Sequence, residues 1–246
     1  MTVAALYVQK DGAYYGLPDV DPWDEERDAR NYSGPWPVVA HPPCARWSRL
    51  AGFTEAVFGL RRGDDGGCFA AALDAVRRFG GVLEHPAYSD AWEHFGLPRP
   101  NRYGGWTASL FDPGWSCYVE QGRYGLPAKK ATWLYACGVD LPDLRWGFVP
   151  DSAGKNPRDS NERGISGGLH AWRDSWRTDV HRVVHKGVSS ATPPEFRDAL
   201  LRMARSALPS LAILPRPSGC SVRARPGLTA LHRGRVLPRL GAAYQS

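Results

Sequence analysis

The sequence predicts an α/β fold built on a doubly wound, mostly parallel sheet. Short apolar runs of strand length alternate with segments that have helical periodicity. Strand, helix and strand in this order favour parallel pairing through crossover connections. A chain of 246 residues, with 43% hydrophobic and 23% charged residues, has the ordinary composition of one globular domain. We therefore expect one main core.

The first elements of this fold lie within the first forty residues. Residues 4–8 (AALYV) form an apolar run that predicts a strand. Residues 23–32 (WDEERDARNY) begin with acids and predict a polar helix. Residues 36–40 (WPVVA) predict a buried strand, which ends at the segment His41-Pro42-Pro43.

A helix and a strand follow in the next part of the chain. Residues 67–79 (GCFAAALDAVRRF) place apolar side chains on one face, as in an amphipathic helix. Gly80 and Gly81 are typical helix-ending residues. Val82 and Leu83 then predict a short strand that ends at Glu84-His85-Pro86.

Two further elements complete the predicted sheet and its covering helices. Residues 131–138 (ATWLYACG) predict another buried strand. Residues 193–207 predict a helix with an apolar stripe, for which Thr192 is the expected N-cap and Pro193 the first helical residue.

The chain divides into a catalytic domain and a basic tail. We assign residues 1–206 to the α/β domain and residues 138–188 within it to a polar, glycine-rich insert of the kind used for binding. Residues 207–246 are expected to be a flexible tail, whose six arginines, without any acid from residue 216 onward, account for the net charge of +6. Such a tail can attract nucleic-acid phosphates, or it can be a solvated extension.

Composition also limits the class of protein. The first apolar run ends after eight residues, and no later window has 18 uninterrupted apolar residues, so neither a signal peptide nor a membrane span is expected. The five cysteines are widely spaced and include no C-x-x-C pair, which argues against a disulfide framework and a zinc ribbon. We therefore expect a cytoplasmic protein with reduced thiols.

Two segments with chemically capable side chains follow predicted strands. In parallel sheets the ligand crevice lies beyond the carboxyl ends of the strands. Cys44 follows a Pro-Pro corner that stiffens its loop, and Glu84 lies at the end of the next predicted strand. Basic neighbours, His41, Arg46 and Arg49, favour the thiolate form of Cys44. The alternative is that Cys44 is a small buried hydrophobe, the usual role of a free cysteine.

A metal site is another interpretation of the same segments. His41, Cys44, Glu84 and His85 carry side chains that suit zinc. Their spacing matches no known zinc motif, and the sequence therefore does not predict a metal.

Four segments together resemble the cytosine-5 DNA methyltransferases. WPVVAHPPCARWSRLAG is similar to that family's strand followed by Pro-Pro-Cys-x-x-x-Ser, and FAAALDAVRRFGGVLEHPA to the helix and strand that lead to its Glu-Asn-Val. GRYGLPAKKATWLYACG resembles its Tyr-Gly-x-Pro-Gln-x-Arg-x-Arg segment, with Lys130 in place of the first arginine. SSATPPEFRDALLRMA resembles its closing helix. The matches are collinear over residues 36–206, and the short chain resembles a compact, phage-type member.

The resemblance implies a Rossmann-like methyltransferase fold with a reduced target-recognition insert. It implies that Cys44 adds to C6 of a cytosine extruded from DNA, or of a related pyrimidine nucleotide, and that Glu84 stabilises the activated ring. The residues that it places around the substrate are Pro43, Arg46, Ser48, His85 and Lys130.

The cofactor implied by the resemblance is S-adenosyl-L-methionine, although the family's Asp-x-Phe-x-Gly-x-Gly fingerprint is absent from this chain. A compressed equivalent would use Asp11 at the end of the first strand and Asp19 or Asp21 near a ribose. These acids can equally form a turn and a helix start. Two alternatives remain open: a non-catalytic binding relative that lost its cofactor site, and a base-modifying enzyme with another donor.

Overall fold

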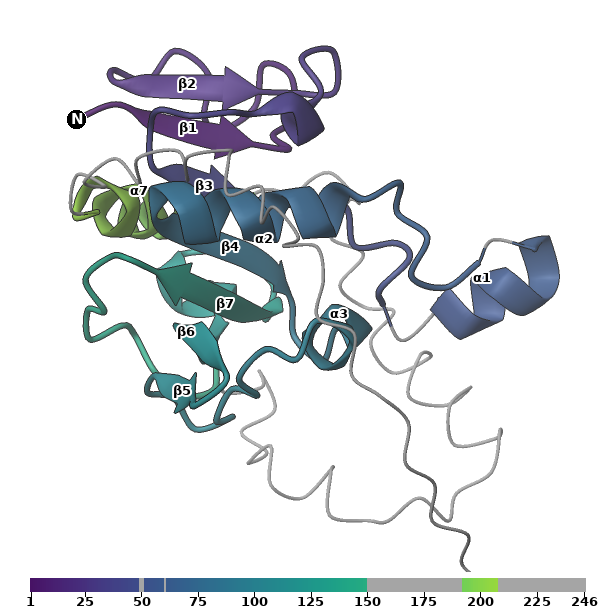
Figure 1. The fold of residues 1–246 in the computed structure, drawn as a ribbon. Helices are drawn as coiled ribbons and strands as arrows, with labels where there is room; N and C mark the ends of the chain where they lie inside the picture. The colour runs from purple at the N-terminus through teal and green to yellow at the C-terminus, as the bar shows by residue number, and fades with distance from the viewer. Residues whose placement is uncertain (49–50, 60, 150–191, 208–246) are drawn as a thin grey trace, which may run out of the picture. The chain divides into compact units, whose positions relative to one another are not determined.

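The computed structural model describes residues 1–48, 51–59, 61–149 and 192–207, all within a compact unit that spans Met1–Leu211. These residues form one seven-stranded sheet in the order β2-β1-β3-β4-β7-β6-β5 (Figure 1). The strands are β1 (Val3–Leu6), β2 (Val20–Trp23), β3 (Val38–Ala40), β4 (Gly81–Pro86), β5 (Thr107–Ser109), β6 (Asp112–Glu120) and β7 (Ala131–Cys137). The helices are α1 (Ala51–Phe58), α2 (Cys68–Phe79), α3 (Asp90–His94) and α7 (Pro194–Arg205), with the 3-10 turns η1 (Ala29–Asn31) and η2 (Gln121–Tyr124).

The sheet is mixed, and only its first half is parallel. β2, β1, β3 and β4 pair in parallel, whereas β7 runs antiparallel to β4 and to β6, and β6 runs antiparallel to β5. Residues 121–130 between β6 and β7 are too few for a crossover, which needs a dozen residues or more, so these strands return directly beside each other. The predicted α/β class is confirmed, and the parallel character is limited to four strands.

The order of the strands reverses at β1. The chain passes from β1 to β2 on one side, then crosses back so that β3 lies on the other side of β1 and leads to β4. In open sheets of this kind, the point where the order reverses leaves a crevice at the carboxyl ends of the strands. The fold therefore places a crevice between the segments that follow β1 and β3.

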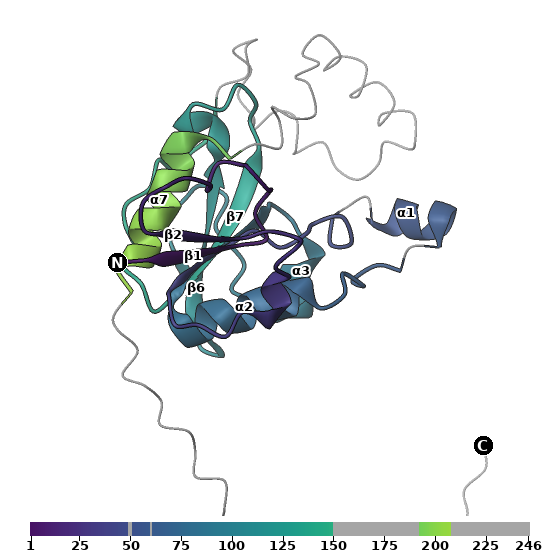
Figure 2. The same cartoon turned by 90° about the horizontal axis from the view of Figure 1, so that it is seen from above.

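Helices cover the two faces of the sheet. α2 packs on one face through Phe69, Leu73 and Val76, and α7 packs on the other through Phe196 and Leu200. Figure 2 shows these two helices on opposite sides of β1. Each large apolar side chain that is fully buried in this way contributes about 1.5–3 kcal/mol to folding.

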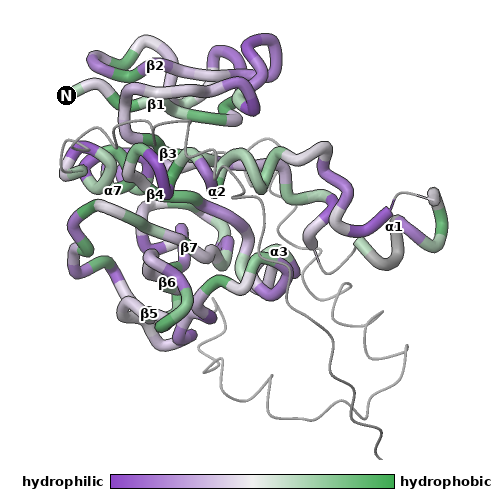
Figure 3. The backbone as a smooth tube through the Cα atoms, in the orientation of Figure 1, coloured by the Kyte–Doolittle hydropathy of each residue, from purple (hydrophilic) through white to green (hydrophobic). Residues whose placement is uncertain are grey.

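Hydropathy follows the same layering. The central strands are largely hydrophobic, and the hydrophilic residues lie in the connections and on the helices (Figure 3). Among the described helices, none has the length and apolar character needed to cross a membrane.

Several predicted elements are confirmed with small changes of boundary, namely β1, β3, β4, β7, α2 and α7. For α7, Pro193 rather than Thr192 is the N-cap, and it makes no side-chain capping bond. The strands β2, β5 and β6 and the short helices α1 and α3 were not predicted. Of the expected insert, residues 138–149 are described; residues 150–188 and most of the expected tail lie outside the described residues.

The predicted helix over residues 23–32 is wrong. Trp23 closes β2, and the Asp24 carboxylate then accepts hydrogen bonds from the backbone N–H groups of Glu26 and Arg27. Asp28 has a left-handed backbone and accepts from the N–H of Arg30, so only the 3-10 turn η1 forms. Aspartate side chains that bond to nearby backbone groups favour turns over helix, and here they outweigh the helical composition.

Candidate functional site

The register of the parallel strands brings His41 beside Glu84. Val39 of β3 is paired with Val82 of β4, and Ala40 with Leu83. One residue further along, His41 and Glu84 therefore lie side by side and point to the same face of the sheet as Val39 and Val82, which is the face covered by α7. The geometry agrees: His41 Nδ1 lies 3.0 Å from Glu84 Oε2.

A pocket of about 470 Å³ opens at these strand ends, and we call it the Cys44 pocket. Its lining includes Cys44 and Glu84 together with Tyr14, His41 and Lys130. The sequence-predicted pair Cys44 and Glu84 thus converges on one cavity, at the point where the strand order reverses. Its volume is within the range of about 300–1,000 Å³ that is usual for small-molecule sites.

A chain of hydrogen bonds fixes the acidic end of the Cys44 pocket. The Tyr14 hydroxyl lies 2.8 Å from His41 Nε2, and His41 Nδ1 bonds to Glu84 Oε2. On its other oxygen, Glu84 accepts a bond of 3.0 Å from the Gln121 amide, which also donates to Thr132 Oγ1. Glu84 is only 8% exposed, and these partners satisfy both of its carboxylate oxygens.

The carboxyl group of Glu84 is held in its ionised form. Burial by itself raises the pKa of this group, but the hydrogen bond and charge of His41, with the charge of Lys130, outweigh burial and lower the pKa below its usual value. The Cys44 pocket therefore carries a fixed negative charge opposite Lys130.

The thiol of Cys44 differs from the sequence-based expectation. Its residue is exposed, yet burial of the thiol by the surrounding loop and the negative charge of Glu84 raise its pKa, with a smaller opposing effect from Lys130. Of the neighbours expected to favour thiolate, His41 lines the pocket, Arg46 does not, and Arg49 lies outside the described residues. At neutral pH the thiol is therefore mostly protonated.

His85 lies on the opposite face of the sheet from Glu84, because side chains alternate along β4. It is fully buried, and its ring packs edge-on against Phe69 at 5.2 Å between centroids. Burial lowers the pKa of His85 to about 4, so the ring is neutral. This placement separates His85 from the pocket in which the resemblance puts it.

The other predicted substrate residues are divided. Pro43 and Lys130 line the Cys44 pocket. Arg46 and Ser48 instead lie in the turn that leads toward α1, where their carbonyl groups accept bonds from Gly63 and Ala51. They do not contribute to the pocket lining.

The acids predicted for the cofactor occupy different places. Asp11 is exposed in the turn after β1, and Asp19 is exposed just before β2, with its carbonyl bonded to Val3. Asp21 lies on β2 and is paired with Arg27 at 2.6 Å. None of the three lines the Cys44 pocket or the neighbouring cavity at the end of β2.

That neighbouring cavity, which we call the Tyr7 pocket, has a volume of about 690 Å³ and is lined by acids that the sequence did not single out. Two of these acids, Asp24 and Asp28, lie just beyond β2. The Tyr7 pocket shares Tyr7, Val8, Gln9 and Pro43 with the Cys44 pocket. The Tyr7 hydroxyl is buried and has no hydrogen-bond partner among the described residues.

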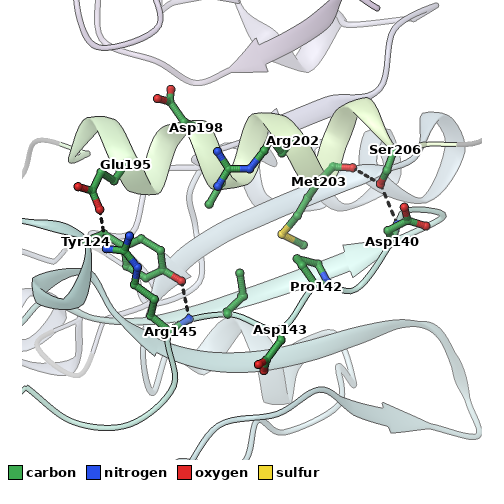
Figure 4. A pocket seen from close by; sticks show the side chains of 12 residues that line it. Tyr124, Asp140, Pro142, Asp143, Arg145, Glu195, Asp198, Arg202, Met203 and Ser206 are labelled. Carbon is green, nitrogen blue, oxygen red and sulfur yellow. Dashed lines mark hydrogen bonds and ion pairs between the residues drawn. The ribbon is translucent and has the colours of Figure 1, made fainter.

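A third cavity, of about 460 Å³, lies between α7 and the segment that follows β7 (Figure 4). Its charged side chains are largely paired, as in the ion pair of Arg145 with Glu195, and its lining contains no cysteine or histidine. Its hydroxyl groups, those of Tyr124 and Ser206, are both hydrogen-bonded to backbone, and without a thiol or an imidazole it is a poorer candidate for chemistry than the Cys44 pocket. Within the described part of the chain, no group of three or more His, Cys, Asp or Glu side chains could hold a metal ion.

Sequence reasoning missed Tyr14 and Gln121. Tyr14 lies just after the first strand, so the strand-end rule that singled out Cys44 could also have singled out this residue. Gln121 gave no such signal, because it reaches Glu84 through the pairing of β4, β7 and β6, and β6 was not predicted.

Comparison with known proteins finds no matching family model, no matching curated protein and no matching solved structure.

Proposed function

We propose that this protein modifies a pyrimidine base, with Cys44 as the nucleophile and Glu84 as the group that stabilises the activated ring. The observation that carries this proposal is that both side chains line the Cys44 pocket, Cys44 from the loop after β3 and Glu84 from β4, the adjacent parallel strand. In such a pocket the thiol can attack one edge of a flat pyrimidine ring while the buried carboxylate binds another edge.

The chemistry follows from these two groups. Addition of the Cys44 sulfur to ring carbon C6 saturates that carbon and pushes electron density onto C5, which becomes nucleophilic. In this proposal Glu84, which is nearly buried, bonds to the exocyclic amine and, when it carries a proton, to ring nitrogen N3, so that charge entering the ring is stabilised in a water-poor site. Lys130 adds a positive charge at the same pocket. A cytosine in DNA, or a free pyrimidine nucleotide, is the proposed substrate.

S-adenosyl-L-methionine is the proposed methyl donor, and the Tyr7 pocket is the place that suits it. Asp24, which accepts from Tyr15, and Asp28, which is paired with Arg30, can share their remaining acceptor capacity with ribose hydroxyl groups, and the Tyr7 hydroxyl, without a partner among the described residues, offers a further polar contact. When bound, this cofactor supplies an electrophilic methyl group. Since the two pockets share Pro43 and the residues after β1, a ligand here lies next to the base site.

Replacing Cys44 with serine is expected to abolish ring activation. Reversible addition to C6 makes the C5 hydrogen of cytosine exchange with solvent, and this requires no methyl donor. We expect the wild-type protein in heavy water to place deuterium at C5 of a cytosine in an oligonucleotide, and Cys44→Ser to lower the rate at least about 100-fold. Mass spectrometry of the recovered oligonucleotide measures the exchange.

Cys137→Ser is the matched control, because Cys137 lies at the far end of β7 from the Cys44 pocket, whereas Cys68 lines the Tyr7 pocket. Equal exchange by the Cys44 and Cys137 variants would exclude Cys44 as the nucleophile. No exchange by the wild-type protein, combined with binding of the oligonucleotide, would favour a second candidate: a base-binding relative without catalysis. The raised pKa of Cys44 is the observation that favours that candidate.

Tyr7→Phe is expected to weaken binding of S-adenosyl-L-methionine by about fivefold to tenfold, the usual value of one hydrogen bond. Calorimetric titration of both proteins measures this. The Cys137→Ser protein should bind as the wild type does. Absence of binding to the wild type would exclude this cofactor and favour a base-modifying enzyme with another donor.

A further inference from the structure

His41 has a place in the Cys44 pocket that the proposed chemistry does not yet use. It lies three residues before Cys44 on the same loop and lines the same pocket. Its two ring nitrogens are both engaged, with the Tyr14 hydroxyl at 2.8 Å and with Glu84 at 3.0 Å. An imidazole fixed at both ends between a phenol and a buried carboxylate is placed to pass a proton.

The two partners of His41 have well-defined protonation states. Burial and the negative charge of Glu84 raise the pKa of Tyr14 well above its usual value, so Tyr14 keeps its proton. The pKa of Glu84 is lowered, so Glu84 is a carboxylate that accepts the proton on His41 Nδ1. Imidazole is the group in such a chain that ordinarily gains and loses a proton near neutral pH.

The proposed ring activation requires a proton on Glu84. A carboxylate can accept a bond from the exocyclic amine of cytosine, but it cannot donate to ring nitrogen N3, which is an acceptor. As the sulfur adds to C6, negative charge moves toward N3 and a proton there becomes necessary. Glu84 must then obtain that proton from a neighbour, and His41 Nδ1 is bonded to it directly.

We propose that His41 stores the proton that Glu84 donates to the ring, and takes it back when the cysteine leaves. This inference rests on the proposed function. In the forward step the Cys44 thiol loses its proton to solvent, the thiolate sulfur bonds to C6, and the C5–C6 double-bond electrons shift into the ring toward N3. The His41 imidazolium gives its Nδ1 proton to the Glu84 carboxylate, which passes a proton to N3, so that Glu84 ends as a carboxylate and His41 as a neutral imidazole. The negative charge of the thiolate and the positive charge of the imidazolium disappear together, so the total charge of the pocket is unchanged.

Tyr14 restricts the form of His41 that can donate. A neutral imidazole that gave up its Nδ1 proton would need the Tyr14 proton at Nε2, and Tyr14 holds that proton firmly. The donor is therefore the imidazolium, with Tyr14 oxygen accepting from Nε2. The charged or titratable groups that face this chain are Cys44 and Lys130 around Glu84, and Arg197 and Asp198 of α7 around Tyr14; His85 acts on Glu84 from the opposite face of the sheet.

The pH dependence of hydrogen exchange at C5 distinguishes a proton-donating role of His41 from a merely structural one. The rate is expected to rise with pH as the Cys44 thiol ionises and to fall again at higher pH, because the step also needs a proton from the pocket, which gives a bell-shaped profile. In His41→Ala the alkaline fall is expected to disappear, because no imidazolium remains to be lost. A residue that only supported the loop would lower the rate at every pH alike.

Chemical rescue of His41→Ala tests the proposal. We expect this variant to exchange cytosine C5 hydrogen about 100-fold or more slowly than the wild type. Imidazole in the buffer should restore the rate, most strongly at a pH where imidazole is protonated. Triazole, which has a similar shape and is a much weaker base, should not. Glu84→Ala should not be rescued by imidazole, because the acceptor of the proton is gone.

The possible outcomes distinguish a failure of this inference from a failure of the proposed function. Wild-type exchange with equal rescue by imidazole and triazole, or a His41→Ala protein that keeps the bell-shaped profile, would show that His41 only fills space. A wild-type protein without exchange would overturn the proposed function, and this inference with it. Far-ultraviolet circular dichroism of His41→Ala checks that the variant is folded.

Discussion

Glu84→Gln is expected to make the Cys44 thiol more reactive and the protein at least about 100-fold slower in ring activation, as when a stabilising hydrogen-bond group is removed. The charge of Glu84 raises the pKa of Cys44, so its removal lowers that pKa and exposes more thiolate at neutral pH. The same change removes the group that passes a proton to the ring. Reactivity and activity should therefore move in opposite directions, which a simple loss of structure cannot produce.

The variant should fold, because the surrounding hydrogen bonds can rearrange. Gln121 now donates its amide to Glu84, and its own oxygen is buried without a partner among the described residues. Rotation of the Gln121 amide presents this oxygen to the amide group of a glutamine at position 84. The new oxygen at position 84 can still accept from His41.

Two measurements check this prediction. Alkylation of Cys44 with iodoacetamide, followed across pH by peptide mass spectrometry, should have a lower pH midpoint in Glu84→Gln than in the wild type. The Cys137 thiol of the same samples serves as an internal control, since the pKa of Cys137 is raised by burial and by Asp112 rather than by Glu84. An unchanged midpoint for Cys44 would show that Glu84 does not act on the thiol, and undiminished exchange at C5 would remove Glu84 from the mechanism.

The sequence predicted the parallel part of the fold because each element there has an uninterrupted local pattern. α2 carries Phe69, Leu73 and Val76 on one face, and the strands on either side of it contain the buried apolar runs Val38–Ala40 and Val82-Leu83. Once strand, helix and strand are recognised, the strand-end rule places Cys44 and Glu84 at one edge. The predicted topology alone was therefore enough to bring these two side chains to the same pocket.

The antiparallel part was missed because its pattern is broken by buried polar groups. β6 contains Pro113 and Gly114, and its buried positions include Ser116 and Glu120, which look like surface residues in the sequence. In the fold they accept hydrogen bonds from the Trp92 indole and from the backbone N–H of Val149, two distant partners that no local pattern reveals. Long-range hydrogen bonds of this kind decide burial without leaving a periodic trace.

The site was predicted incompletely for the same reason. The resemblance placed both Glu84 and His85 at the substrate, but adjacent residues on a strand face opposite sides of the sheet. His85 instead packs between Phe69 and Trp92. The charges around Cys44 also depend on the register between β3 and β4, and the composition of the Cys44 loop does not predict that register.

Gly81→Ala is expected to cost about 4 kcal/mol or more of unfolding free energy, a large part of the 5–15 kcal/mol typical of a domain. Gly81 begins β4 with φ near 139°, a conformation that side chains with a Cβ rarely adopt. A Cβ there would lie 2.0 Å from the carbonyl oxygen of Val38, its neighbour on β3. Backbone cannot move aside as a flexible side chain can, so β3 and β4 would have to separate or shift.

The same substitution should disturb the Cys44 pocket, because the pairing of Val38 with Gly81 sets the register that brings His41 beside Glu84. Gly16→Ala is the matched control: Gly16 also has a positive φ, of 70°, but a Cβ there meets nothing within 4 Å. We expect it to cost only about 1 kcal/mol, the usual value for left-handed backbone. Urea unfolding followed by tryptophan fluorescence measures both; equal stability of the two variants would show that the β3–β4 contact yields without cost, and that the register rests on other contacts.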